Sequence, residues 1–196
     1  MKVRCFTALC FSPPVLDKIA EHIKEIKQII SPEAGTIKWE RKENIHLTLN
    51  FFGEIEETIL QKLIEETKKR MSPHEGPLHL SLSGIGTFPD ERHPKVIWLG
   101  CEDKSNRLEK IHAMVNDIAK ECGEGQVNIE DRRFTPHITI GRVKMLNKPF
   151  LLVDALHKYA KNDDFLIDEN VGYLSYMRSV LTSGGSVYAT VENIPL

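Results

Sequence analysis

The segment His46-Leu47-Thr48-Leu49 has a counterpart in the second half of the chain, His137-Ile138-Thr139-Ile140. Both read His-apolar-Thr-apolar. In an extended strand, residues i and i+2 lie on the same face, so each segment predicts a strand with a histidine and a threonine on one face and core residues on the other. Histidine titrates near neutral pH and a threonine hydroxyl can donate a hydrogen bond. Two such strands could place two acid–base groups and two anion donors around one phosphate.

Strands and amphipathic helices alternate along the rest of the chain. Apolar spacing predicts helices from about 13 to 30, 57 to 71, 108 to 122 and 149 to 161. Strands are expected at 3–11, 36–40, 45–52, 78–83, 96–100, 165–177 and 186–191, with a loop over 84–95. Because the helices are too few to cover both faces of a parallel sheet, we predict an α+β fold with antiparallel sheets and outer helices. The repeated order around the motifs predicts two pseudo-symmetric lobes, with the active site in the cleft between them.

Size and composition indicate one globular domain. The 196 residues are 41% hydrophobic and 28% charged, which is ordinary for such a protein and sufficient for a sizeable core. We therefore interpret 1–196 as a single domain made of the two lobes. The net charge of −2 provides no global attraction for nucleic acid, so any RNA contact must come from a local patch.

The cysteines and the apolar runs bear on the compartment. Four scattered cysteines show neither the paired spacing of a zinc site nor the density of a secreted scaffold. The N-terminus lacks a signal-peptide layout, and no apolar run approaches the ~20 residues of a membrane span. We expect a cytoplasmic protein without membrane contact, and a monomer, because a cleft within one chain needs no partner.

Two histidines on separate strands suit the hydrolysis of a cyclic phosphodiester. The reaction needs a base to activate water, an acid to protonate the departing ribose oxygen, and donors for the phosphoryl oxygens. Because attack and departure are roughly in line through phosphorus, acid and base belong on opposite sides of the phosphate. Thr48 and Thr139 would bind the non-bridging oxygens, so neither a metal nor another cofactor is required. A zinc hydrolase is the metal alternative, but the sequence has no His-Glu-x-x-His or paired Cys-x-x-Cys.

The two motifs extend over His46–Gly53 and Phe134–Arg142. These segments resemble the signatures of the 2H phosphoesterase superfamily, and within it those of the RNA 2′,3′-cyclic phosphodiesterases, also called 2′-5′ RNA ligases. The resemblance continues in the opening strand, the middle of the chain and the last hairpin, at 4–9, 86–89, 96–100, 179–185 and Tyr188. It therefore covers nearly the whole chain.

That resemblance implies a bilobal α+β fold and a metal-independent reaction. A 2′,3′-cyclic phosphate at an RNA 3′ end would be opened to a 2′-phosphomonoester, and reverse 2′-5′ ligation would use the same groups. By the resemblance, His46 would be the proton donor and His137 the proton acceptor that activates water, an order that the spacing of the motifs does not give. Thr48 and Thr139 would hold the phosphate.

A basic cluster brackets the second motif and consists of Arg132, Arg133, Arg142 and Lys144. Because arginine can bind phosphate through two parallel hydrogen bonds, Arg133 and Arg142 are candidate RNA contacts, and Arg178 is a third. Strand parity places Arg142 on the face opposite His137, unless Gly141 introduces a bulge. A solvated surface position is the alternative for these arginines.

The aromatic residues after the first motif are the remaining candidates. Phe51 shares the parity of Leu47 and Leu49, which predicts a core position. Phe52 is less constrained and could stack on a base of the RNA.

Two other functions remain open from the sequence. The same cleft could act on a small cyclic nucleotide, or it could bind a nucleotide or an RNA end without turnover. A comparison of oligonucleotides with mononucleotides separates the first from RNA processing. The presence of both histidines and both threonines favours an enzyme over a binding module.

Overall fold

The computed structural model describes residues 1–71, 76–129, 133–161, 166–183 and 185–196. Within them the strands are β1 (Lys2–Leu9), β2 (Gly35–Trp39), β3 (Leu47–Glu56), β4 (Leu78–Phe88), β5 (Val96–Glu102), β6 (His137–Leu146), β7 (Leu166–Val171), β8 (Tyr173–Thr182) and β9 (Gly185–Pro195). The α-helices are α1 (Pro13–Ile29), α2 (Glu57–Arg70), α3 (Arg107–Cys122) and α4 (Pro149–Lys161), and the short 3-10 helices are η1 (Pro32–Ala34) and η2 (Lys42–Asn44).

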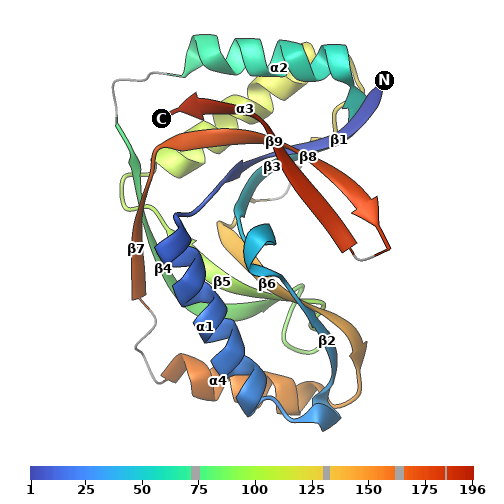
Figure 1. Ribbon diagram of the computed structural model, residues 1–196, viewed down its shortest axis with the longest axis vertical. Coiled ribbons are helices and arrows are strands. Elements are labelled where there is room, and N and C mark those ends of the chain that lie inside the picture. Colours follow the sequence, from blue (N-terminus) through green and yellow to red (C-terminus); the bar gives the residue numbers. More distant parts are fainter. Residues whose placement is uncertain (72–75, 130–132, 162–165, 184) are drawn as a thin grey trace.

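The strands form one antiparallel sheet in the order β7-β4-β5-β6-β3-β1-β8-β9, with β2 also paired to β6. The two motif strands, β3 and β6, are neighbours in this order, and they are joined through one residue pair, Leu47 with Ile138. This narrow join divides the sheet into a first lobe (β1, β3, β8 and β9 with α2 and α3) and a second lobe (β2, β4, β5, β6 and β7 with α1 and α4), as Figure 1 shows. The predicted α+β class, with antiparallel strands and outer helices, is confirmed.

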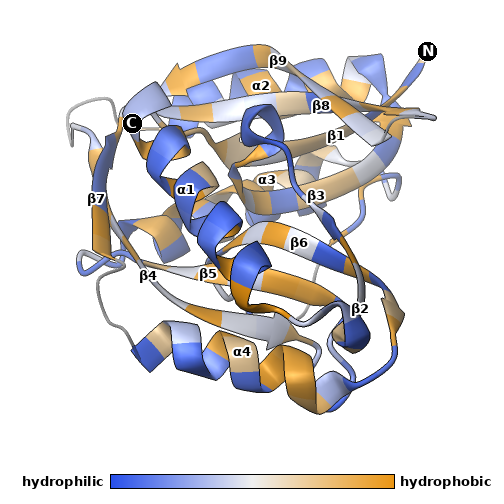
Figure 2. Cartoon of the chain, turned by 60° about the horizontal axis from the view of Figure 1, so that its bottom comes forward, coloured by the Kyte–Doolittle hydropathy of each residue, from blue (hydrophilic) through white to orange (hydrophobic). Residues whose placement is uncertain are grey.

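Each helix buries one stripe of apolar residues. The α1 helix begins at Pro13 and Pro14, where proline is compatible with the first turn. Its buried side chains are Val15, Ile19, Ile23 and Ile26, and Figure 2 shows mostly hydrophilic residues on its opposite side. The core is continuous between the lobes, because one cluster of buried side chains includes residues from β1, β3, β4, β5 and β6.

Two glycines explain where the strands differ from the sequence-based expectation. The expected loop after residue 83 is instead the second half of β4, which runs to Phe88. The register against β5 shifts at Gly84, whose φ of +72° suits a bulge residue. The expected single strand over 165–177 is two strands separated by Gly172, where the chain passes from β7 in the second lobe to β8 in the first; residue 165 lies outside the described residues.

Candidate active site

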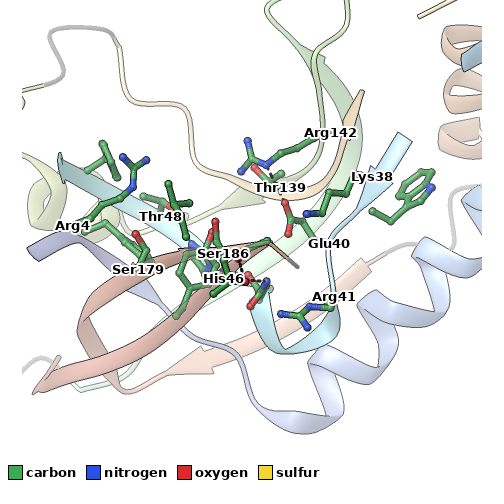
Figure 3. Close-up of a pocket in the computed structure, with 18 of the residues that line it drawn as sticks. Arg4, Lys38, Glu40, Arg41, His46, Thr48, Thr139, Arg142, Ser179 and Ser186 are labelled. Atoms are coloured by element: carbon green, nitrogen blue, oxygen red, sulfur yellow. Dashed lines mark hydrogen bonds and ion pairs between the residues drawn. The ribbon is translucent and has the colours of Figure 1, made fainter. Parts of the chain in front are cut away.

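A pocket of about 400 Å³ lies where the two motif strands meet. The four motif side chains that the sequence singles out, His46, Thr48, His137 and Thr139, all line it. Figure 3 shows several of them together with residues from β1, β2 and the β8–β9 hairpin. Alternation along a strand explains why His and Thr of each motif share this face, while Leu47 and Ile138 between them are fully buried.

Both histidine rings are held in the same way. The Nδ1–H of His46 donates to the backbone carbonyl of Asn44 (2.7 Å), and the Nδ1–H of His137 donates to that of Thr135 (2.8 Å). Since a carbonyl can only accept, these contacts fix the tautomer and leave Nε2 as the nitrogen that exchanges a proton. In each case the anchor is the carbonyl two residues before the ring, so the geometry repeats in the two lobes.

His46 lies in an aromatic setting within the first lobe. Its ring stacks on Phe6 at 5.0 Å between centroids and meets Tyr188 edge-on at 5.1 Å. Burial lowers its pKa from the ordinary value of 6.5; the hydrogen bond to the Asn44 carbonyl raises it, and the nearby positive charge of Arg142 lowers it further. The neutral ring therefore predominates in the unliganded pocket at neutral pH, and its Nε2 accepts a hydrogen bond from the Thr48 hydroxyl (3.0 Å).

His137 has a different neighbour on its outer side. Phe88, the last residue of β4, contacts the ring edge-on at 4.9 Å and is itself packed at 5.2 Å against Trp98 of β5. The ring is thus held by its backbone anchor and contacted by Phe88, which forms an aromatic pair with Trp98.

A β-bulge after Thr139 turns Arg142 into the pocket. Along β6, Thr139 and Gly141 pair with consecutive residues of β5, and Ile140 between them has no partner in that strand. The extra residue reverses the facing of those that follow it. Arg142 consequently lines the same pocket as His137. Without a bulge, strand parity would have placed the two side chains on opposite faces.

A corresponding bulge follows Thr48. Along β3, Thr48 and Asn50 pair with consecutive residues of β1, so Leu49 is the extra residue. Phe51 therefore lines the pocket, with the Arg4 guanidinium 4.5 Å above its ring. It packs partly buried against Phe6, Ala8 and Met177, and not on the face of Leu47 and Leu49 that its parity predicted. Phe52 instead packs in the core, 1% exposed and stacked on Tyr176 at 5.9 Å, so it does not reach the pocket.

The other basic candidates lie elsewhere. Arg178 and Arg133 are exposed and do not line the pocket, while position 132 falls outside the described residues. The pocket instead contains five cationic side chains and one carboxylate: Arg4, Lys38, Arg41, Arg142, Lys144 and Glu40. Arg142 donates from Nε to Glu40 Oε1 (3.0 Å). The pocket is therefore positively charged, although the chain as a whole carries a net charge of −2.

Sequence reasoning missed Arg4, Lys38, Arg41 and Tyr188 as pocket residues. Arg4 and Phe6 alternate on β1, which could have indicated a shared face once β1 was paired with the motif strand. Lys38 and Arg41 enter through the pairing of β2 with β6, two segments far apart in the chain, and no local pattern signals that pairing.

The described part of the chain carries neither a metal cluster nor a membrane-spanning helix. In it, no three His, Cys, Asp or Glu side chains are grouped closely enough to hold a metal ion. None of the helices found there combines the length and apolar character that crossing a membrane requires.

The chain is similar to known proteins over almost its full length. A family model described as the 2′-5′ RNA ligase superfamily matches residues 15–179. A protein of Aquifex aeolicus named RNA 2′,3′-cyclic phosphodiesterase is 31% identical over 199 residues, covering 99% of this chain and 97% of that protein. A protein of the same name from Methanocaldococcus jannaschii is 29% identical, with 97% and 99% covered.

Solved structures share the fold. The crystal structure of E. coli LigT complexed with 3′-AMP superposes with a TM-score of 0.75 at 21% identity, covering 100% of this chain and 99% of that one. At this level of identity the likeness concerns the fold alone.

Proposed function

The chain belongs to the 2′-5′ RNA ligase superfamily, and from this premise we propose that it hydrolyses the 2′,3′-cyclic phosphodiester at the 3′ end of an RNA to a 2′-phosphomonoester. The relatives' shared name, RNA 2′,3′-cyclic phosphodiesterase, supports the reaction. The observation that carries the proposal is the repeated geometry of the two motif histidines, each anchored through Nδ1 and each lining one positively charged pocket.

In the proposed mechanism the two histidines act on opposite sides of the phosphate. His137 Nε2 takes a proton from the attacking water, and His46 Nε2 gives a proton to the departing 3′ oxygen of the ribose. His46 must be protonated for this role, whereas burial favours its neutral form in the empty pocket. The negative charge of a bound phosphate raises the pKa of the ring, so substrate binding itself prepares the acid.

The phosphoryl oxygens need donors that are in place before the reaction. Thr48 and Thr139 flank the two histidines, and Arg142 brings a guanidinium held by Glu40. Donors fixed in advance stabilise the charge that develops on the non-bridging oxygens. When phosphate binds, the Thr48 hydroxyl can transfer its hydrogen bond from His46 to a phosphate oxygen, which frees Nε2 for proton transfer. Reverse 2′-5′ ligation would follow the same steps in the opposite order.

The proposal is tested by phosphorus NMR of an RNA oligonucleotide with a 2′,3′-cyclic end. We expect conversion to a 2′-phosphate, with a loss of at least about 10²-fold in kcat for His46→Ala and for His137→Ala. His157→Ala, which changes an exposed histidine outside the pocket, serves as the matched control and should retain full activity. Full activity in either motif variant, with unchanged circular dichroism, would refute the assignment.

Removal of metal provides a separate prediction. Because the proposed acid, base and anion donors are all side chains, dialysis against EDTA should leave kcat unchanged within error. Inhibition that is reversed by added zinc would favour a metal-dependent hydrolase instead.

A further inference from the structure

Three cationic side chains follow one another at one end of the pocket. Lys38 on β2 lies directly opposite Arg142 on β6 in the register of the two strands. Lys144 is two residues beyond Arg142 and also lines the pocket; at the usual rise of a strand this is about 6.6 Å further along β6. Figure 3 shows Lys38, Glu40 and Arg41 on one side of the motif side chains, with Arg4 on the other.

This arrangement places like charges next to one another. Lysine and arginine directly opposite in a sheet repel each other and destabilise the pair. Glu40 is the single carboxylate among the residues that line the pocket, and it is engaged by Arg142 Nε. With the residues that the structure describes, neither Lys38 nor Lys144 forms an ion pair, whereas exposed lysines outside the pocket, such as Lys62 and Lys68, do. A bound anion would offset this excess of positive charge.

The Lys38 side chain reaches from the second lobe to the first. A β-carbon built on Gly185, at the start of β9, would lie 2.7 Å from Lys38 Nζ. Glycine at this position therefore lets the ammonium group lie against the backbone of the hairpin. Asn44 fixes the neighbouring residue by donating from Nδ2 to the Ser186 carbonyl (3.1 Å). The Lys38 ammonium group thus lies at the pocket, beside the start of β9 in the first lobe.

Along β6 the sequence order Thr139, Arg142, Lys144 leads away from the catalytic threonine. A phosphate held at Thr48 and Thr139 is within the reach of Arg142, while Lys144 lies beyond it. A 2′,3′-cyclic phosphate ends the RNA on its 3′ side, so the next phosphate of the substrate is the phosphodiester that joins the 5′ oxygen of the last nucleotide to the preceding one. Lysine is a suitable point charge for such a group.

We propose that Lys38 and Lys144 form a second phosphate site, which binds the phosphodiester between the last two nucleotides of the RNA. This inference rests on the proposed function of the same pocket and deepens it: the preferred substrate is an RNA of two or more nucleotides, and a cyclic mononucleotide lacks the group that the site binds.

The experiment measures binding separately from turnover. Isothermal titration compares adenosine 2′-phosphate with the diadenylate ApA that carries a 2′-phosphate, for the wild-type protein and for Lys38→Gln/Lys144→Gln. The control is Lys18→Gln/Lys110→Gln, which removes the same charge from exposed positions on α1 and α3. The double pocket variant should lose at least about tenfold in affinity for the dinucleotide and less than twofold for the mononucleotide. The control variant should match the wild type on both.

The outcomes are distinct. A preference for the dinucleotide that disappears in the pocket variant, together with a shallower salt dependence of binding, supports the second site. An equal loss on both ligands would assign the lysines to the terminal phosphate, and no loss on either would leave them without a role in binding; both results overturn the inference. Turnover of the corresponding cyclic nucleotides by the wild type is measured in parallel, so a failure of the proposed reaction is seen independently of the binding result.

Discussion

His46 is a motif side chain whose surroundings shift its pKa. Its ring lies between Phe6 and Tyr188 and its Nδ1–H is bound to a carbonyl. Desolvation is the larger effect and lowers the pKa. A buried neutral histidine of this kind makes the stability of the protein depend on pH.

We predict that acid destabilises the wild-type protein more than His46→Gln. Because the folded-state pKa of His46 lies below the ordinary 6.5, the unfolded chain binds more protons in that window. The free energy of unfolding therefore falls as the pH drops below about 6.5. The loss of stability reaches its full size once the pH is below the lowered pKa of His46. Urea denaturation from pH 8 to pH 5 measures it. His22, whose pKa burial also lowers, is present in both proteins; parallel curves would contradict the prediction.

Gly86 offers a second test at the level of one residue. A β-carbon there would lie 2.3 Å from the Trp98 ring, and Trp98 packs on Phe88, which contacts His137. Gly86→Ala should cost about 1–3 kcal/mol of stability by overpacking and should lower kcat by displacing the His137 ring. Gly172→Ala, where nothing lies within 4 Å of the new carbon, should change neither the stability nor kcat. Unaltered kcat in Gly86→Ala would show that Phe88 does not position the histidine.

At the scale of the element, the two bulges determine what the sequence could predict. Simple alternation places His46, Thr48, His137 and Thr139 on common faces, and the structure brings all four to one pocket. The alternation of side chains is interrupted at Leu49 and Ile140, the extra residues of the two bulges. A bulge depends on how a strand pairs with a neighbour distant in the sequence, so the facing of Phe51 and of Arg142 was not available from local pattern.

The bulge in β3 is stabilised from behind by buried side chains. Asn50, 4% exposed, donates from its backbone N–H to Thr7 Oγ1 (3.2 Å) and from Nδ2 to Asn116 Oδ1 (3.0 Å). The Thr7 hydroxyl, fully buried, donates back to Asn50 Oδ1 (3.2 Å). The carbonyl of Leu49, the extra residue of the bulge, accepts from His112 Nδ1 (3.1 Å). The irregular backbone is therefore satisfied internally, as a buried segment requires.

We predict that Asn50 and Thr7 are energetically coupled. Asn50→Ala removes Oδ1, the acceptor of the buried Thr7 hydroxyl, and should destabilise by about 1–3 kcal/mol. Adding Thr7→Val removes the hydroxyl that has lost its acceptor, so the double variant should be more stable than the sum of the two single effects predicts, by about 0.5–3 kcal/mol. A double-mutant cycle in urea measures the coupling. Strict additivity would mean that the two side chains do not act together.

At the scale of the whole molecule, the lobes meet at the point where the chemistry is proposed. Leu47 pairs with Ile138, and each is flanked by the histidine and threonine of its own motif. Among the residues that the structure describes, this pair is the one place where the motif strands are in register, and it lies next to both histidines. Sequence periodicity suggested two lobes, but it could not show that they share one sheet.

Leu47→Ala should impair activity beyond its effect on stability. Leu47 is fully buried, and its truncation should cost about 2–5 kcal/mol. Leu80→Ala, an equally buried leucine on β4, provides a control with a comparable cost. Measured at a temperature where both variants are folded, kcat should fall more in Leu47→Ala. Equal values would show that the join between the lobes does not set the geometry of the site.

The interleaved order of the strands also bears on how the chain is made. In the first lobe, β8 (Tyr173–Thr182) lies between β1 (Lys2–Leu9) and β9, so one edge of β1 is paired only with a strand that is made much later. An open strand edge is a template for pairing with other molecules, and domains of a growing chain fold only as their parts emerge. Once β1 and β3 have paired, the other edge of β1 stays open until β8 has been made. The yield of the protein in cells should depend on chaperones more than the stability of the finished fold would suggest.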